Sequence, residues 1–313
     1  MITGIKYWVL TMLVMTQLLV CAPVSYSQDG KLSSAKKTYT LAYMRSVFDD
    51  VDINDAQAAI KVWVREIVKK YRYNDRYDLD AKIYSDYNEL NEQIKTDNIA
   101  AVSLSTYDYL TYGIRLGLEP AFVPSKNGNI NVEYYLITRK KDNYKDIKEL
   151  KGSRIGIDSE PKHLASKLWL DVTLARNNIP DKKKFFKEMI ENTKESQLIL
   201  NVFFDQLDAC VVSKYSFQIM CELNPQVSEK LVSIANSPSY LLGLTCFTKT
   251  FNDANERNLF RTDITNVKKL ASGKQLFTII RIDNVVPFQN EYLGNYKNLL
   301  KEYNNFIKLK KID

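Results

Sequence analysis

Short apolar runs alternate along the chain with segments in which apolar residues recur every three or four positions. The first pattern predicts buried strands, and the second predicts amphipathic helices. The strongest helical pattern is 55–71, where Ile60, Trp63 and Ile67 share one face. The predicted strands are 38–44, 79–84, 100–104, 121–124, 133–139, 154–158, 207–213, 231–235 and 242–248. The predicted helices are 55–71, 86–95, 107–116, 142–150, 196–206, 215–223, 252–271 and 288–307, with another beginning near Leu164.

Strands that alternate with helices throughout indicate an α/β fold built on mixed, mostly parallel sheets flanked by helices. In such sheets ligands bind outside the carboxyl ends of the strands. The polar turns that follow predicted strands are therefore the candidate binding positions. They contain Arg45, Ser46, Ser105, Thr106, Lys162, His163 and Ser213.

The stretch 151–171 is the most informative of these turns. A predicted strand, 154–158, leads into a polar turn, 159–163, and then into a helix, so that the turn lies at a helix N-terminus. Unpaired N–H groups and the helix dipole favour an anion at such a position. Lys162 and the single histidine of the chain, His163, fall in this turn. The stretch predicts half of an anion-binding cleft.

The composition argues against several functional classes. The net charge of +7 comes from scattered lysines without a recognition motif, which indicates solvated helix faces and not nucleic-acid binding. The sequence contains no GxSxG motif, no P-loop and no metal-ligand spacing. Enzymatic activity, a cofactor and a metal are therefore not expected, and a hydrolase that depends on His163 is the less favoured alternative.

The N-terminus has the proportions of a signal peptide, 1–27, with an apolar core over residues 7–20 and small residues before Gln28. Two alternatives remain: a lipoprotein anchored through Cys21, and an uncleaved membrane anchor. Either way the remaining chain is expected outside the cytoplasmic membrane, in the periplasm. Three further cysteines, Cys210, Cys221 and Cys246, allow one disulfide, although small buried apolar residues are the favoured interpretation.

Three segments, 83–110, 137–171 and 198–217, resemble in order and spacing the phosphate, phosphite and phosphonate substrate-binding proteins of ABC transporters. This family has the type 2 periplasmic binding fold. The resemblance implies two lobes, 38–139 plus 242–313 and 140–241, joined by crossover strands at 133–139 and 242–248. It also implies closure around a small anionic ligand.

The resemblance adds Tyr109 to the candidate site, since the family has a cleft tyrosine there. Three positions depart from the family pattern. Ser105-Thr106 stands where the family commonly has Gly-Pro. Glu160-Pro161-Lys162-His163 replaces a hydroxyl-rich turn, and Ser213 replaces an acidic residue. Each candidate also has a structural interpretation: Ser105 and Thr106 can cap a helix, Tyr109 can pack in a core, and Lys162 can face solvent.

The function that the resemblance implies is a monomeric periplasmic solute-binding protein that delivers a phosphate- or phosphonate-like anion to an ABC permease. A ligand-sensing partner of a membrane sensor protein is the alternative.

Overall fold

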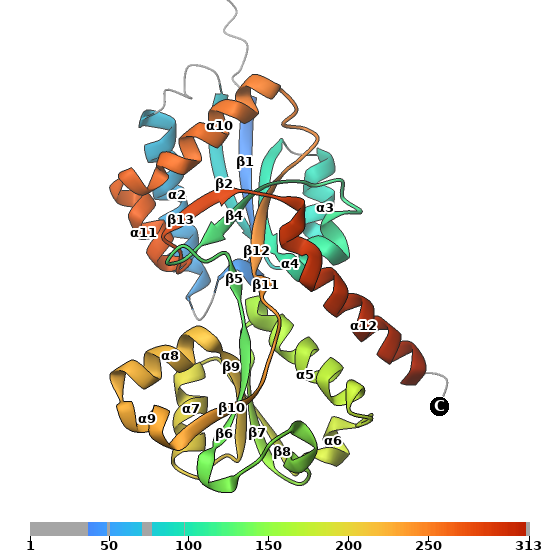
Figure 1. The fold of residues 1–313 in the computed structure, drawn as a ribbon. Coiled ribbons are helices and arrows are strands. Elements are labelled where there is room, and N and C mark those ends of the chain that lie inside the picture. The colour runs from blue at the N-terminus through green and yellow to red at the C-terminus, as the bar shows by residue number, and fades with distance from the viewer. Residues whose placement is uncertain (1–36, 49–50, 71–76, 97, 311–313) are drawn as a thin grey trace, which may run out of the picture. The chain divides into compact units, whose positions relative to one another are not determined.

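The structure is a computed structural model that describes residues 37–310 except 49–50, 71–76 and 97. The predicted signal peptide and Cys21 lie outside these residues. Two main sheets organise the described chain, and each has its own flanking helices (Figure 1). None of the helices among the described residues combines the length and the apolar character needed to cross a membrane.

The six-stranded sheet has the order β13-β4-β12-β3-β1-β2. Its strands are β1 (Lys37–Met44), β2 (Tyr77–Tyr84), β3 (Ile99–Ser105), β4 (Glu119–Ser125), β12 (Gly243–Phe247) and β13 (Asn284–Pro287). β1 runs parallel to β2 and β3, whereas β12 and β13 pair antiparallel with their neighbours. The helices attached to this part of the chain are α2 (Ile53–Lys70), α3 (Tyr87–Thr96), α4 (Thr106–Asp108), a π-helical turn (Tyr109–Gly113), α10 (Ala254–Asn266) and α11 (Ala271–Ile279).

The five-stranded sheet has the order β10-β6-β9-β7-β8. Its strands are β6 (Tyr134–Arg139), β7 (Arg154–Asp158), β8 (Glu188–Asn192), β9 (Ala209–Ser213) and β10 (Leu231–Asn236). β7 runs parallel to β8 and β9, whereas β6 is antiparallel to β9 and β10. The helices between these strands are α5 (Leu164–Arg176), α6 (Lys182–Phe185), α7 (Glu195–Phe203), α8 (Lys214–Leu223) and α9 (Pro225–Lys230). Single 3-10 turns cover Arg45–Val47, Lys140–Asp142, Ile147–Leu150, Pro161–His163, Val267–Lys269 and Asn290–Leu293.

The chain passes between the sheets through two short strands that pair with each other. β5 (Asn131–Val132) and β11 (Tyr240–Leu241) form an antiparallel ribbon. The predicted crossover strands, 133–139 and 242–248, correspond to β6 and β12, which belong to the sheets on either side of the ribbon. Each crossing is therefore shorter than predicted, and it lies just before the predicted crossover strand along the chain.

The C-terminal segment makes contacts with both parts of the molecule. β13 pairs with β4 in the six-stranded sheet. The last helix, α12 (Gly294–Lys310), packs against α5, and its Tyr296 and Leu299 join the core cluster around Trp169. An exposed ion pair of 2.7 Å between Arg176 and Glu302 adds to this contact.

The predicted α/β class with mixed sheets is confirmed, but antiparallel pairing is more common than the alternation of strands and helices suggests. The returning strand β12 and the edge strands account for the difference. β8 and β13 were not predicted, because both are short edge strands whose residues are largely half-buried or exposed. The predicted helix 252–271 is interrupted at Leu270, where the backbone becomes extended. All three described cysteines are free, and Cys210 and Cys246 are fully buried, as expected for small apolar residues.

Two glycines should respond in opposite ways to a methyl group. A Cβ on Gly273 in α11 would lie 2.1 Å from the Val267 carbonyl oxygen, so the backbone would have to move. Gly273→Ala is expected to lower the free energy of unfolding by about 1–3 kcal/mol. Gly294→Ala, at the start of α12 with no atom within 4 Å of the new Cβ, should leave stability unchanged or raise it by about 0.4–1 kcal/mol. Denaturant unfolding checks both, and equal effects would contradict this packing argument.

Candidate binding cleft

One continuous cavity of about 760 Å³ is lined by residues from both main sheets. Ser46 follows β1 and Ser105 ends β3 in the six-stranded sheet, whereas His163 follows β7 and Ser213 ends β9 in the five-stranded sheet. These strands are parallel within each sheet. The polar lining therefore lies at the carboxyl ends of parallel strands, where α/β proteins bind ligands.

The cavity brings together five of the eight residues predicted for the site: Ser46, Ser105, Lys162, His163 and Ser213. They come from four separate turns of the chain, and the turn after β1 contacts the turn after β7. Their role in binding stays a prediction. Their placement gives the cavity hydroxyl groups from both sheets, together with the charged side chains of one turn, although Ser46 and Ser213 donate their O–H groups to carboxylates of the protein.

The other three predicted residues lie behind the lining. The Arg45 guanidinium donates hydrogen bonds to the carbonyl oxygens of Phe48 and Val51. Thr106 is fully buried, and Tyr109 is 8% exposed within a core cluster, where burial raises its pKa. Tyr109 thus packs in a core, whereas Thr106 is not the helix cap: Ser105 caps α4, and Thr106 Oγ1 has no hydrogen-bond partner among the described residues. A role of these three residues in binding stays a prediction.

Asp108 holds the hydroxyl groups of the six-stranded part in place. Its backbone N–H donates to Ser105 Oγ at 3.1 Å, which caps the short helix α4. Ser46 Oγ in turn donates to the Asp108 carboxylate. Both serines are thus fixed relative to one residue, Ser105 through its backbone N–H and Ser46 through its carboxylate, and the turn after β1 is tied to the turn after β3.

His163 is paired with the buried carboxylate of Asp158. The imidazole Nδ1 is hydrogen-bonded to Asp158 Oδ2, and Asp158 Oδ1 accepts the Glu160 N–H at 2.9 Å. Burial by itself would lower the pKa of His163, but the hydrogen bond and charge of Asp158, with the charge of Glu195, raise the pKa above its usual value. Lys162 opposes this rise more weakly. The Asp158 carboxylate therefore favours the cationic form of this imidazole more than water does for a free histidine.

Glu195 is a site residue that the sequence did not reveal. It is the first residue of α7, and its carboxylate accepts hydrogen bonds from Ser213 N–H, Ser213 Oγ and Ser216 Oγ. The edge strand β8 pairs with β7 and leads the chain to Glu195 at the cavity. Because β8 was not predicted, Glu195 was not predicted as a lining residue either. The carboxylate that appeared to be lost at Ser213 is thus supplied from a neighbouring turn.

Three further cations line the cavity: Lys126, Lys214 and Arg281. Lys214 pairs with Glu133 at 3.1 Å, and Lys126 lies 5.7 Å from the Tyr215 ring centroid. Together with Lys162 and His163 they outnumber the lining carboxylates Glu133 and Glu195. Lys126 and Arg281 come from isolated loop positions without a sequence pattern, whereas Lys214 is the first residue of α8, directly after Ser213. The excess of positive charge suits an anionic ligand.

A smaller cavity of about 280 Å³ lies beside the first and shares His163, Glu195, Ser216 and Arg281 with it. Glu160 lines this smaller cavity and not the larger one, so its carboxylate is not part of the main lining. Among the described residues, one group of three, Asp158, His163 and Glu195, has the donor types for a divalent cation, with atoms within 4.8 Å of one another. The His163 ring nitrogen and both carboxylates are engaged in the hydrogen bonds described for His163 and Glu195.

The sequence from 55 to 293 matches the model of a family described as the periplasmic substrate-binding protein of phosphonate ABC transporters. No curated protein matches the chain.

Solved structures share the fold at low sequence identity. XAC2383 from Xanthomonas citri, bound to ATP, has a TM-score of 0.61 at 10% identity, over 87% of this chain and 99% of that one. A binding protein component of an ABC phosphonate transporter from Pseudomonas aeruginosa has a TM-score of 0.55 at 13% identity, over 87% and 88%. PhnD1 from Prochlorococcus marinus, in complex with methylphosphonate, has a TM-score of 0.55 at 16% identity, over 86% and 98%. The predicted type 2 periplasmic binding fold is confirmed.

Proposed function

Since the chain belongs to the family of periplasmic substrate-binding proteins of phosphonate ABC transporters, we propose that its 760 Å³ cavity binds an anion with a phosphate- or phosphonate-like head group. The observation that carries this proposal is the lining of the cavity. An excess of cationic side chains converges there, at the carboxyl ends of the strands, beside the serine hydroxyls. Such groups form charge-assisted hydrogen bonds with oxyanions.

Binding proceeds, in this proposal, by closure of two lobes, one built on the six-stranded sheet and one on the five-stranded sheet; β6 (Tyr134–Arg139) belongs to the second lobe, although the predicted boundary at 139 put it in the first. The β5–β11 ribbon supplies the hinge, because the two chain crossings pair there. The loaded protein then docks on the permease of its transporter. The ligand is transferred and not converted, which agrees with a family of binding proteins.

The periplasmic location of the family supports export of this chain. We assign residues 1–27 to a cleaved signal peptide, with lipid anchoring at Cys21 as the alternative, and we assign the mature protein as a monomer. Mass spectrometry of the membrane and periplasmic fractions distinguishes an N-terminus at Gln28 from a lipid-modified one at Cys21.

Calorimetry and thermal unfolding at low salt test the ligand class with phosphate, phosphite, sulfate, methylphosphonate and acetate. An anion at a hundred times its dissociation constant should stabilise the protein by about 2.7 kcal/mol. Lys162→Gln is expected to weaken binding of that anion about tenfold to a hundredfold, because a charge-assisted hydrogen bond is lost. Lys183→Gln on α6, which is exposed and far from the lining, is the matched control. Absence of binding to every anion would refute the proposal.

A further inference from the structure

The cavity has two chemically different ends. The serine and cationic residues described above form its polar end. Its other end extends beneath the helices α2, α10 and α11, which lie together on one side of the six-stranded sheet (Figure 1). The side chains that line this apolar end are Trp63, Phe260, Ile264, Leu276, Phe277 and Ile280.

These side chains belong to, or pack against, the main core cluster of the six-stranded part. Trp63 and Leu276 are each only 2% exposed, so the apolar end is an interior space and not an open surface. Protein cores are normally close-packed, and an internal cavity reduces stability because the lining loses its contacts. A cavity lined by Leu, Ile and Phe side chains takes up apolar molecules.

The Trp63 side chain provides a second, independent indication of a ligand. Its indole Nε1 is buried, and no hydrogen-bond acceptor for it occurs among the described residues. A buried N–H group without a partner costs free energy, so such groups are rare in folded proteins. An ether, ester or acid oxygen on a bound molecule would satisfy this donor.

The size of the cavity also exceeds what a head group needs. Cavities of about 300–1,000 Å³ hold drug-sized ligands, and this one has about 760 Å³. Phosphate and methylphosphonate contain only a few heavy atoms and leave the apolar end unfilled.

We propose that the ligand is an amphiphilic organic anion, with an oxyanion head group at the polar end and an apolar chain or ring between α2, α10 and α11. This inference rests on the proposed function and names the class of ligand. The head group is held by the cationic residues and serines. The apolar body fills the interior space. Its transfer out of water favours binding in proportion to the apolar area that is buried.

A homologous series tests the inference by calorimetry on the mature chain: methyl-, propyl- and hexylphosphonic acid, with 1-hexanol as the uncharged control. From propyl to hexyl, binding should tighten about fourfold per added methylene, which corresponds to about 0.8 kcal/mol each. Hexanol should bind far more weakly than hexylphosphonate, because it lacks the head group. No gain beyond the methyl compound would overturn the inference, and so would an equal affinity for hexanol.

Two substitutions on the same helix locate the chain. Ile264→Asn places a polar group in the apolar end, whereas Leu259→Asn lies on the exposed face of α10. Ile264→Asn should remove most of the gain from propyl to hexyl and leave methylphosphonate binding unchanged, and Leu259→Asn should change neither. Ile264→Phe, which fills the same space with an apolar ring, replaces Ile264→Asn if that variant does not fold. It should also weaken hexyl binding selectively.

The outcomes separate the two proposals. If no anion in the series binds, the proposed function and this inference both fail. If methylphosphonate binds and chain length has no effect, the function stands and the amphiphilic ligand is refuted. An equal loss of methyl- and hexylphosphonate binding in both Ile264 variants would also refute it.

Discussion

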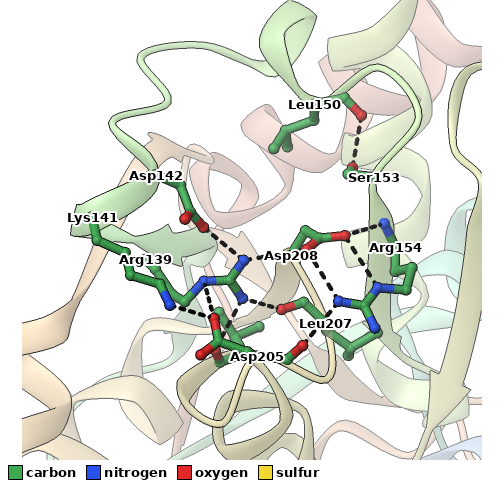
Figure 2. A network of polar contacts seen from close by, with 10 residues as sticks. Arg139, Lys141, Asp142, Leu150, Ser153, Arg154, Asp205, Leu207 and Asp208 are labelled. Carbon is green, nitrogen blue, oxygen red and sulfur yellow. Dashed lines mark hydrogen bonds and ion pairs between the residues drawn. The ribbon is translucent and has the colours of Figure 1, made fainter.

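Replacement of Arg139 by methionine is expected to lower the free energy of unfolding by about 3 kcal/mol. Arg139 ends β6 and is 7% exposed. Its guanidinium forms ion pairs with Asp142 at 2.7 Å, Asp205 at 2.9 Å and Asp208 at 3.2 Å, and donates to the Leu207 carbonyl (Figure 2). Methionine keeps much of the apolar volume and removes every one of these interactions.

The expected cost lies at the lower end of the range for buried ion pairs, because the partners keep other contacts. Asp208 still accepts hydrogen bonds from Arg154, and Asp205 still pairs with Lys141 (Figure 2). The network nevertheless loses its central cation, which connects β6 with the loop before β9. Three carboxylates then stay close together with less compensation.

The pH dependence gives the prediction a second readout. Burial tends to raise the pKa of Asp208, but the hydrogen bonds from Arg154 and Arg139 outweigh it and lower the pKa. A lowered carboxyl pKa contributes stability above the unfolded value of about 3.9, and that contribution is lost as the pH falls further. The difference between wild type and Arg139→Met should therefore be full near pH 7 and shrink in strong acid.

Urea unfolding at pH 7 and pH 3 measures the loss of unfolding free energy and its dependence on pH. Arg176→Met is the control, because its ion pair with Glu302 is largely exposed and should contribute less than about 1 kcal/mol. A similar loss in the two variants would show that Arg139 does not organise this region.

His163→Gln is expected to lower the free energy of unfolding by about 2 kcal/mol at pH 6 and to flatten its pH dependence. Glutamine can donate one hydrogen bond to Asp158, but it carries no charge, so the buried carboxylate loses its counter-ion. The raised pKa of His163 means that the wild-type contribution is fully present below the unfolded value of about 6.5. It is lost as the pH rises through the folded value.

The variant should thus differ most from wild type below pH 6.5 and least in alkaline solution. The chain contains one histidine, so no second imidazole titrates in this window. Lys162→Gln, next to the imidazole, should keep the pH dependence but move it to slightly higher pH, because the charge of Lys162 lowers the pKa of His163. Unfolding curves from pH 5.5 to 9 measure this pH dependence. If the free energy of unfolding of His163→Gln changed with pH as in the wild type, a group other than His163 would be responsible.

The sequence predicted the elements with strong periodicity and missed those held by tertiary contacts. Strand 154–158 and the helix start at Leu164 were predicted to the residue, because a buried apolar run meets a clear polar turn there. β8 was not predicted because this edge strand buries little apolar surface and its sequence is largely polar. The same distinction between local pattern and tertiary contact applies to the residues of the candidate site.

Serines at strand ends can be located from local pattern alone. Ser105 and Ser213 both end strands and line the cavity, and their role in binding stays a prediction. Glu195 and Arg281 could not be predicted, because the first depends on the unrecognised β8 and the second on a loop residue with a positive φ of 55°. The apolar end could not be predicted for another reason. Trp63 and Phe277 contribute to the same helical periodicity whether they fill a core or line a cavity.

The last helix adds a third mechanical connection between the two sheets. Leu293, just before α12, packs in a core cluster of the six-stranded part, whereas Tyr296 and Leu299 pack with α5. Any rotation about the β5–β11 ribbon that widens the cavity must also separate α12 from α5 or slide them past each other. The packing of α12 on α5 therefore opposes the lobe rotation proposed above, in addition to the stiffness of the ribbon itself.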